Sequence, residues 1–481
     1  MKHGFSLIEI LIAIAILTSA IVAASVTIHQ LPFVVQDAYG DLEEVRSADE
    51  RMSETEILAR SKYAEAIQGR SVVSQKFADG AAGLMQGTLR SLITDPGIAA
   101  DEPCQPFLSG DWQHPHVAGS YELIPGALLP GAVPAGLYPV SSLAIAGDTL
   151  AIGIANTTRT PDPNVFFFRL SETNGAPAYA GSFDAATSSK NGVPALASGN
   201  GYVYAANGFS GVSTTTCIGN PGACAQLQVI DPHSVPPQRI SFLQIPTALP
   251  AHAVLASGAT APGNAISYHA GYAYLGLGKT AQGQELQIID VRDPLHPHRV
   301  AGAQIGRGVN AIAVNEQDAY VGTDDNDATG KAVIAFDISD TANPLVESSY
   351  RFPGAGFVRA LAVSGTHLFS GRTFAAGNSE EFTLLDRSAT TSLSRVGGSD
   401  IGTAALRQGA YALLIRDFMA FILADHQLIS MNVINPSALA AYAALPLPHG
   451  TATSMACREN TLYIGSVDTD GNGYLSVVTS S

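Results

Sequence analysis

A four-strand pattern that recurs from residue 140 onward constrains this chain of 481 residues more than any other feature. Residues 308–353 show one whole copy: NAIAV, DAYVG, AVIAFDISD, a turn containing NP, and LVESSYRFP. The second strands are anchored at intervals of 53, 70, 46, 49, 52 and 42 residues by Ala151, Tyr204, Tyr274, Tyr320, Phe369, Phe421 and Tyr463. Four-stranded units that repeat about every 40–50 residues are typical of propeller blades. The sequence therefore predicts a mainly β fold, a seven-bladed β-propeller.

The seventh copy ends at YLSVVTSS and lacks its fourth strand. The segment HPHVAGSYELIPG at 114–126 echoes HPHRVAGAQIG at 296–306, which occupies a fourth-strand position. We therefore predict that residues 117–124 pair beside 474–478 and close the ring, which removes the exposed edge of an open sheet. The alternative is an open or six-bladed array.

The recurring motif LQIID followed by two prolines resembles the LVIVD-repeat propellers of microbial cell-surface proteins. A propeller does not define its function, because the fold hosts both binding modules and enzymes. The sequence contains no Gly-x-Ser-x-Gly motif and no Walker-type phosphate loop, so we do not expect an enzyme.

An apolar run of 24 residues, 5–28, opens the chain after a short leader. At about 1.5 Å per helical residue it can cross the roughly 30 Å hydrocarbon core of a bilayer. It is too long for an ordinary secretory signal and no clean cleavage site follows it. Glu9 lies inside this run, although an acid costs about 2.5–3.5 kcal/mol at the bilayer centre. Glu9 therefore needs a partner; the alternative is a simple signal anchor with a chance acid.

The residues Gly4-Phe5-Ser6-Leu7-Ile8-Glu9, preceded by Lys2, resemble the prepilin signal of type IV pilins and pseudopilins. The resemblance implies that a prepilin peptidase cleaves the Gly4–Phe5 bond and that Phe5 becomes N-methylated. It also implies that the apolar helix stays in the mature protein, where Glu9 meets the terminal amine of a neighbouring subunit during filament assembly. A carboxylate in a low dielectric gains strongly from such an opposite charge.

Pro32 and an amphipathic pattern beyond it suggest that the long N-terminal helix continues as a stalk. The predicted domains are the leader 1–4, the transmembrane and filament-core helix 5–31, stalk α-helices 32–95, a Pro-rich linker 96–116 and the β-propeller 117–481.

The charge balance limits the partners. Lys and Arg number 25 against 41 Asp and Glu, a net charge of -16, so nucleic acid is not expected as a partner. The resemblance implies other pilin-like subunits, the prepilin peptidase and the inner membrane as partners, with an unknown surface ligand or cargo for the propeller.

Two groups of residues are candidate sites in the repeat region. Cys217 and Cys224 bracket the turn CIGNPGAC and are predicted to form a disulfide in an oxidising compartment. Cys104 and Cys457 are expected as buried free thiols, and the alternative is that these two pair as well. Asp468, Asp470 and Asn472 have the alternating spacing of a calcium loop, but the acid expected at the twelfth position is replaced by Thr479. The missing acid favours a plain hairpin turn, with calcium binding kept as the alternative, and no other cofactor is expected.

Two His-Pro-His triplets, at 114–116 and 296–298, could suggest a metal site. Their matching place in the repeat makes them turn residues instead.

These features predict a minor type IV pilin-like filament subunit that displays its propeller for surface binding or adhesion. The precursor would sit in the inner (cytoplasmic) membrane with the propeller outside the cytoplasm, and the mature form in a surface or periplasmic filament. A pseudopilin of a type II-like secretion system that contacts cargo, and a membrane-tethered propeller enzyme, are the alternatives.

Overall fold

The computed structural model describes most of the chain beyond residue 110. The described residues are 111–155, 163–171, 176–184, 192–208, 225–245, 261–280, 284–325, 331–353, 356–374, 380–388, 392–401, 409–416 and 419–480. The chain divides into two units, residues 1–98 and 99–481, and all described residues belong to the second. The predicted leader, transmembrane helix and stalk lie outside the described residues. In the part that is described, no helix is long and apolar enough to span a membrane.

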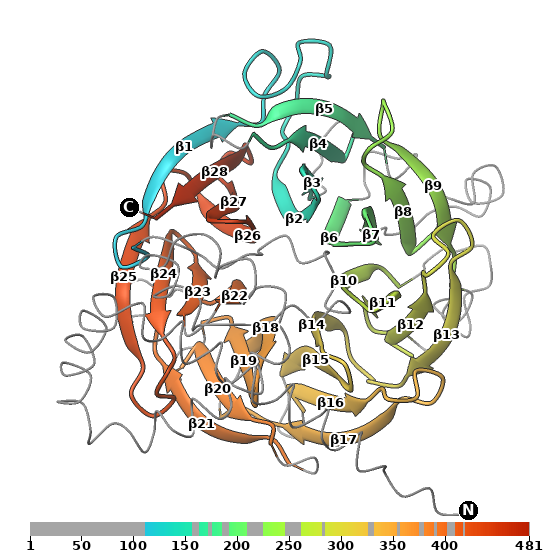
Figure 1. Ribbon diagram of the computed structural model, residues 1–481, viewed down its shortest axis with the longest axis vertical. Helices are drawn as coiled ribbons and strands as arrows, with labels where there is room; N and C mark the ends of the chain where they lie inside the picture. Colours follow the sequence, from blue (N-terminus) through green and yellow to red (C-terminus); the bar gives the residue numbers. More distant parts are fainter. Residues whose placement is uncertain are drawn as a thin grey trace, which may run out of the picture. The chain divides into compact units, whose positions relative to one another are not determined.

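The described residues form a β-propeller of seven four-stranded antiparallel blades, as the repeat predicted (Figure 1). The first strand of each blade lies nearest the axis and the fourth lies at the rim. Blade 1 consists of β2 (Val140–Ala146), β3 (Thr149–Ile154), β4 (Val165–Arg169) and β5 (Ala178–Phe183). Blade 2 consists of β6 (Gly192–Gly199), β7 (Tyr202–Gly208), β8 (Leu227–Asp231) and β9 (Gln238–Leu243). Blade 3 consists of β10 (Gly263–His269), β11 (Tyr272–Leu277), β12 (Leu286–Asp290) and β13 (His298–Ala303). Blade 4 consists of β14 (Val309–Val314), β15 (Asp318–Asp325), β16 (Val333–Asp337) and β17 (Leu345–Tyr350). Blade 5 consists of β18 (Gly356–Ser364), β19 (His367–Arg372), β20 (Phe382–Asp386) and β21 (Ser394–Ser399). Blade 6 consists of β22 (Ala412–Arg416), β23 (Met419–Ala424), β24 (Gln427–Asn432) and β25 (Ala440–Pro446).

Blade 7 closes the ring with strands from both ends of the propeller. It contains β26 (Thr451–Arg458), β27 (Thr461–Val467) and β28 (Gly473–Thr479), and its rim strand is β1 (His116–Glu122). β1 pairs antiparallel with β28 from His116 opposite Thr479 to Glu122 opposite Tyr474. The predicted closure is confirmed, and Figure 1 shows β1 beside β28 at the rim.

The two faces of the ring differ in their connections. Because each blade is antiparallel, its first-to-second and third-to-fourth connections share one face, here called the turn face. The second-to-third and blade-to-blade connections share the other, here called the loop face. The described propeller begins at residue 111 and ends at residue 480, both on the turn face, because β1 starts there and β28 ends there.

Tight turns on the turn face have clear local causes. Asn200–Gly201 and Ala270–Gly271 have positive φ at both residues, 51° and 79° in the first pair and 48° and 84° in the second. This backbone suits the twist of a two-residue hairpin. In blades 2–6 the third strand ends in an Asp or Asn whose side chain accepts a backbone N–H two residues later, at Asp231, Asp290, Asp337, Asp386 and Asn432. This side-chain turn ends the strand and explains the Asp of the repeat.

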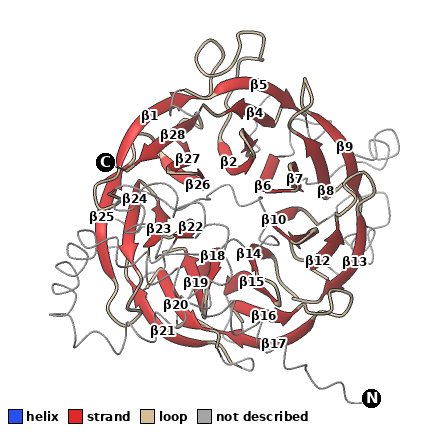
Figure 2. Cartoon of the chain, in the orientation of Figure 1, coloured by secondary structure: helices blue, strands red, loops and turns tan. Residues whose placement is uncertain are grey.

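The core lies between neighbouring blades and consists of apolar side chains from both. All seven second-strand anchors are buried, with less than 5% of their surface exposed. Regular structure in the described residues consists of strands alone, as Figure 2 shows, so packing of sheet on sheet around the ring supplies the core.

Candidate functional site

The residues predicted to be processed are not among those described. Gly4, Phe5 and Glu9 lie outside the described residues, as do Cys217, Cys224 and Cys104. Their predicted roles therefore stay predictions.

Cys457 differs from the prediction of a free thiol. It is disulfide-bonded and 1% exposed, in β26 at the interface of blades 6 and 7. The three other cysteines of the chain all lie outside the described residues. Burial alone suggested an inert thiol, and the sequence offered no spacing that could show the pairing.

The loop predicted as a calcium site forms a hairpin turn between β27 and β28. One carboxylate oxygen of Asp468 accepts the backbone N–H groups of Asp470 and Asn472 at 2.9 and 2.8 Å. The other accepts the Asn472 amide at 2.8 Å and the Tyr474 hydroxyl at 3.2 Å. Although burial opposes it, these hydrogen bonds leave the pKa of Asp468 lowered. The Asp468 carboxylate thus stabilises the turn, as the hairpin interpretation of this loop expects. Within the described ranges, no group of three His, Cys, Asp or Glu side chains converges as a metal site.

The His-Pro-His segments are also turns. Nδ1 of His296 lies 2.8 Å from an Asp293 carboxylate oxygen, and the same relation holds for His114 and Asp111 at 2.5 Å. In both turns the backbone N–H of the histidine donates to the backbone carbonyl of the aspartate at 3.1 Å. The histidine holds down the pKa of its aspartate in each turn. In each case the turn leads into a fourth strand, β13 after His296 and β1 after His114.

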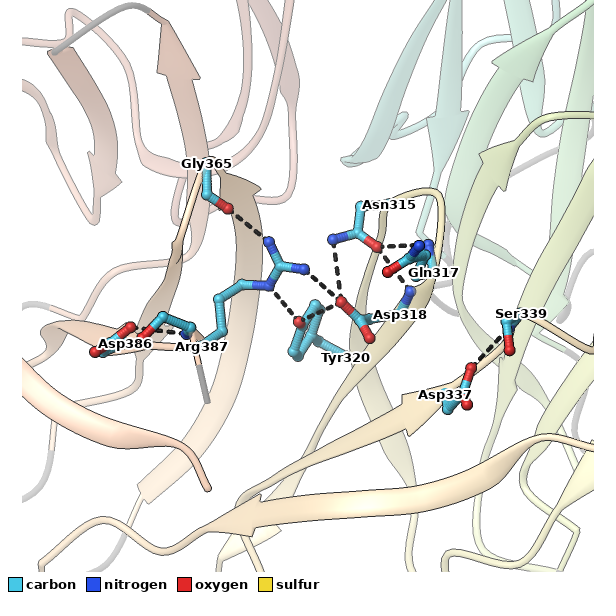
Figure 3. Close-up of polar contacts among 10 residues, drawn as sticks. Asn315, Gln317, Asp318, Tyr320, Asp337, Ser339, Gly365, Asp386 and Arg387 are labelled. Carbon is cyan, nitrogen blue, oxygen red and sulfur yellow. Dashed lines mark hydrogen bonds and ion pairs between the residues drawn. The ribbon is translucent and has the colours of Figure 1, made fainter. Parts of the chain in front are cut away.

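The most developed polar cluster of the described residues crosses from blade 4 to blade 5 on the turn face (Figure 3). Arg387, which follows β20 of blade 5, forms an ion pair with Asp318 and donates to the hydroxyl of Tyr320, both at the start of β15 in blade 4. The same guanidinium donates to the Gly365 carbonyl at 2.6 Å in its own blade. The side chains of Arg387 and Asp318 are only 19% and 14% exposed. The pair is therefore little screened by solvent.

The surrounding hydrogen bonds fix the orientation of Asp318. The carboxylate oxygen that pairs with Arg387 also accepts the Tyr320 hydroxyl at 3.0 Å and the Asn315 amide at 3.3 Å, while the backbone N–H of Asp318 donates to the Asn315 side-chain oxygen at 2.7 Å. Burial raises the pKa of Tyr320. Each polar group in this cluster is hydrogen-bonded to another group of the cluster, so the cluster links blades 4 and 5 structurally.

A third carboxyl group, that of Glu347, belongs to this cluster. Glu347 is the extra residue of a β-bulge between β16 and β17. Burial raises the pKa of Glu347, and the negative charges of Asp318 and Asp337 add to the effect, as does a hydrogen bond with Asp318. The raised pKa favours the protonated form of Glu347.

The same two blades are joined on the loop face by backbone hydrogen bonding. Asp324 and Asp325 of β15 pair with Phe357 and Gly356 of β18, so blades 4 and 5 form one eight-stranded sheet. The other described sheets each contain four strands. Blades 4 and 5 are therefore joined at both faces, and nothing in the repeat pattern of the sequence indicates this pairing.

Comparison with known proteins identifies the beginning of the chain and its fold. Residues 1–25 match the prokaryotic N-terminal methylation motif. No curated protein matches the chain. Among solved structures, a chain of the crystal structure of the mitotic checkpoint complex matches with a TM-score of 0.51 and 14% identity, over 77% of this chain and 95% of that chain. At this identity the likeness shows the fold alone.

The protein thus joins a prepilin-type methylation motif to a seven-bladed propeller, the combination expected of a pilin-like protein that carries a propeller. Such a motif implies processing by a prepilin peptidase and assembly with pilin-like subunits. The resemblance to LVIVD repeats stays a prediction.

Proposed function

We propose that this chain is a minor pilin-like subunit that displays its propeller from a type IV filament for binding to a surface. The observation that carries the proposal is the methylation motif at residues 1–25 on the same chain as a closed propeller. A propeller of this size fits an accessory subunit because the common pilin body is much smaller.

Two features of the propeller support its display, one concerning the compartment and the other the face that is presented. Cys457 is disulfide-bonded, and disulfides persist in oxidising compartments such as the periplasm and the cell surface. The described propeller begins and ends on the turn face, so its loop face carries neither end. We assign ligand binding to that loop face, and binding rather than catalysis to the propeller as a whole.

Processing and incorporation test the filament assignment. Mass spectrometry of the mature amino terminus should find N-methylated Phe5, and Gly4→Val should block cleavage because the peptidase needs a small residue before the cut. Glu9→Leu should be cleaved but incorporated poorly, because the charge partner of the neighbouring subunit is lost. Leu11→Ile, a neutral change in the same apolar run, is the matched control.

The outcomes separate the alternatives. A wild-type chain that still begins at Met1, or Glu9→Leu incorporated as well as Leu11→Ile, would contradict the proposal. Propeller that is found on sheared surface fibres supports a pilus, whereas propeller retained in the periplasm favours a pseudopilin of a secretion system.

A further inference from the structure

The innermost strands of the propeller share an irregularity near the loop face. In six of the seven blades the pairing of the first strand with the second contains a register shift, close to the start of the first strand. The extra residues are Ser141, residues 193–194, Asn264, Asn310, Arg359 and Thr453. Bulges of this kind re-aim a side chain and are frequent next to binding sites.

Three of these residues come from consecutive blades. Asn264, Asn310 and Arg359 belong to β10, β14 and β18, which neighbour one another around the axis (Figure 1). Each lies between buried residues of its strand, yet Asn264 and Asn310 are half-buried and Arg359 is exposed. An exposed side chain on the innermost strand of a ring faces the solvent at the axis. The three side chains therefore lie at one level near the loop-face end of the axis.

Arg359 is held in place without an ion pair. Its guanidinium carbon lies 5.5 Å from the ring centroid of Phe357, a cation–π contact, and Phe357 is paired to Asp324 of blade 4. No carboxylate forms an ion pair with Arg359 among the described residues, although the chain as a whole has a net charge of -16. A fixed, exposed guanidinium with this environment keeps its donors available to a ligand.

The carboxyl group of Asp425 lies on the same face in blade 6 and is engaged elsewhere. Burial raises the pKa of Asp425, while its hydrogen bond with Tyr411 and the charge of His426 act against that rise. Arg359 acts on Tyr411, where its charge opposes the rise of the phenol pKa to about 12. The charge of Arg359 therefore acts on the Tyr411 phenol, while the Asp425 carboxyl group is engaged by its hydrogen bond with Tyr411.

We propose that Arg359, together with the amides of Asn264 and Asn310, binds an anionic oxygen group at the loop-face end of the propeller axis. The group is a carboxylate or a phosphate, because a guanidinium presents parallel N–H donors that match two oxygens and each amide adds N–H donors beside them. None of the six bulge positions carries a carboxylate that would repel such a group. The proposal rests on the proposed function only in that this group belongs to the ligand of the displayed propeller.

Calorimetric titration of the full chain in detergent tests the site directly. Inorganic phosphate and acetate, each at constant ionic strength, are the two probes, and the stronger of them identifies the source of the anion. Arg359→Gln should weaken binding by roughly ten- to a hundredfold, as expected for loss of charge-assisted hydrogen bonds. Arg359→Lys should lie between, because a point charge remains without the fork. Asn310→Ala should weaken binding by about two- to tenfold, as for a neutral hydrogen bond.

Arg351→Gln is the matched control, since Arg351 is exposed and follows β17 at the loop face but lies at the rim. It removes the same charge and should leave both affinities unchanged. Absence of binding heat with both probes for the wild-type chain, or equal weakening by Arg351→Gln and Arg359→Gln, would overturn the proposal. Equal thermal unfolding of the variants shows that the fold is kept. Because purified protein is titrated, failure here leaves the filament assignment standing, and failure of filament assembly leaves this result standing.

Discussion

Glu347 is the charged exception in a series of seven structurally equivalent residues. Every blade has a bulge between its third and fourth strands, and the extra residues are Ala118, Ala180, Ile240, Val300, Glu347, Val396 and Tyr442. Four of the others pack into apolar clusters between their own blade and the next: Ala180, Ile240, Val300 and Val396. At the interface of blades 4 and 5 the corresponding place is taken by a carboxyl group beside Asp318 and Arg387.

The raised pKa of Glu347 makes part of the stability of the propeller depend on pH. A carboxyl group whose pKa is higher in the folded than in the unfolded chain binds more protons when folded, so its contribution is full below the unfolded value and is lost as the pH rises through the folded value. Glu347→Gln is neutral at every pH and can still donate to Asp318. The variant should therefore gain stability relative to wild type between about pH 4 and about pH 7.

Urea unfolding of both proteins at the two pH values measures this difference. Glu316→Gln, at an exposed glutamate of the neighbouring turn, removes the same charge away from the pair and serves as the control. A stability difference between Glu347→Gln and wild type that does not change with pH would contradict the raised pKa of Glu347.

Residues that repeat were predictable from the sequence, and residues that break the repeat were not. Tyr204, Tyr274 and Tyr320 were recognised as anchors because each recurs at a blade spacing, and all three are buried. Glu347 gave no signal because its raised pKa depends on burial and on Asp318 and Asp337, which lie on other strands of blade 4. The pairing of Asp324 with Phe357 was missed because a contact between blades has no sequence period.

At the scale of elements, the proline turns connect one blade to the next. The Pro237 ring of blade 2 lies so close to Gly181 of β5 that a Cβ added at Gly181 would meet it. The Ser241 hydroxyl of β9 donates to the Pro294 carbonyl of blade 3. The carbonyl oxygen of Pro436 in blade 6 approaches Gly397 in β21 so closely that an added Cβ would lie 1.8 Å from it. The prolines of the repeat, recognised in the sequence only as turn residues, therefore also set the approach of neighbouring blades.

Gly397→Ala should destabilise the propeller. Its new methyl group meets a backbone carbonyl that cannot rotate away, so blades 5 and 6 must shift, at about 1–3 kcal/mol for overpacking of this kind. Chemical unfolding monitored by circular dichroism measures the loss.

Gly131→Ala is the matched control. No atom lies within 4 Å of a Cβ added at Gly131, and its φ is not in the left-handed region. Unfolding midpoints of the two variants that agree with each other would show that the close approach at Gly397 does not limit the packing of the blades.

At the scale of the whole molecule, the closure extends further than the predicted boundary of the propeller. Residues 111–116 were assigned to the linker, yet Trp112 is 2% exposed and packs edge-on against Phe421 of blade 6, with ring centroids 4.9 Å apart. Its indole N–H donates to Asn460 at 3.0 Å, and its carbonyl accepts from Ser430 at 3.0 Å. Trp112 thus anchors the strand that completes blade 7 to blade 6. A single Trp carries no repeat signal, so its role could not be read from the sequence.

Trp112→Ala in the full chain should open the ring. Large-to-small changes of buried aromatic residues cost about 3–5 kcal/mol, and here the loss falls on the segment that holds β1 against β28. Once β1 detaches, β28 presents an unpaired edge, which favours association with other copies. The urea midpoint should fall and light scattering should rise. Trp112→Phe keeps most of the apolar contact and loses the hydrogen bond to Asn460. Its midpoint should therefore lie close to wild type, because the free energy of unfolding falls by only about 0.5–1.5 kcal/mol. Wild-type midpoints and scattering for Trp112→Ala would mean that β1 is held by its pairing with β28 alone and that the anchor on blade 6 contributes little to closure.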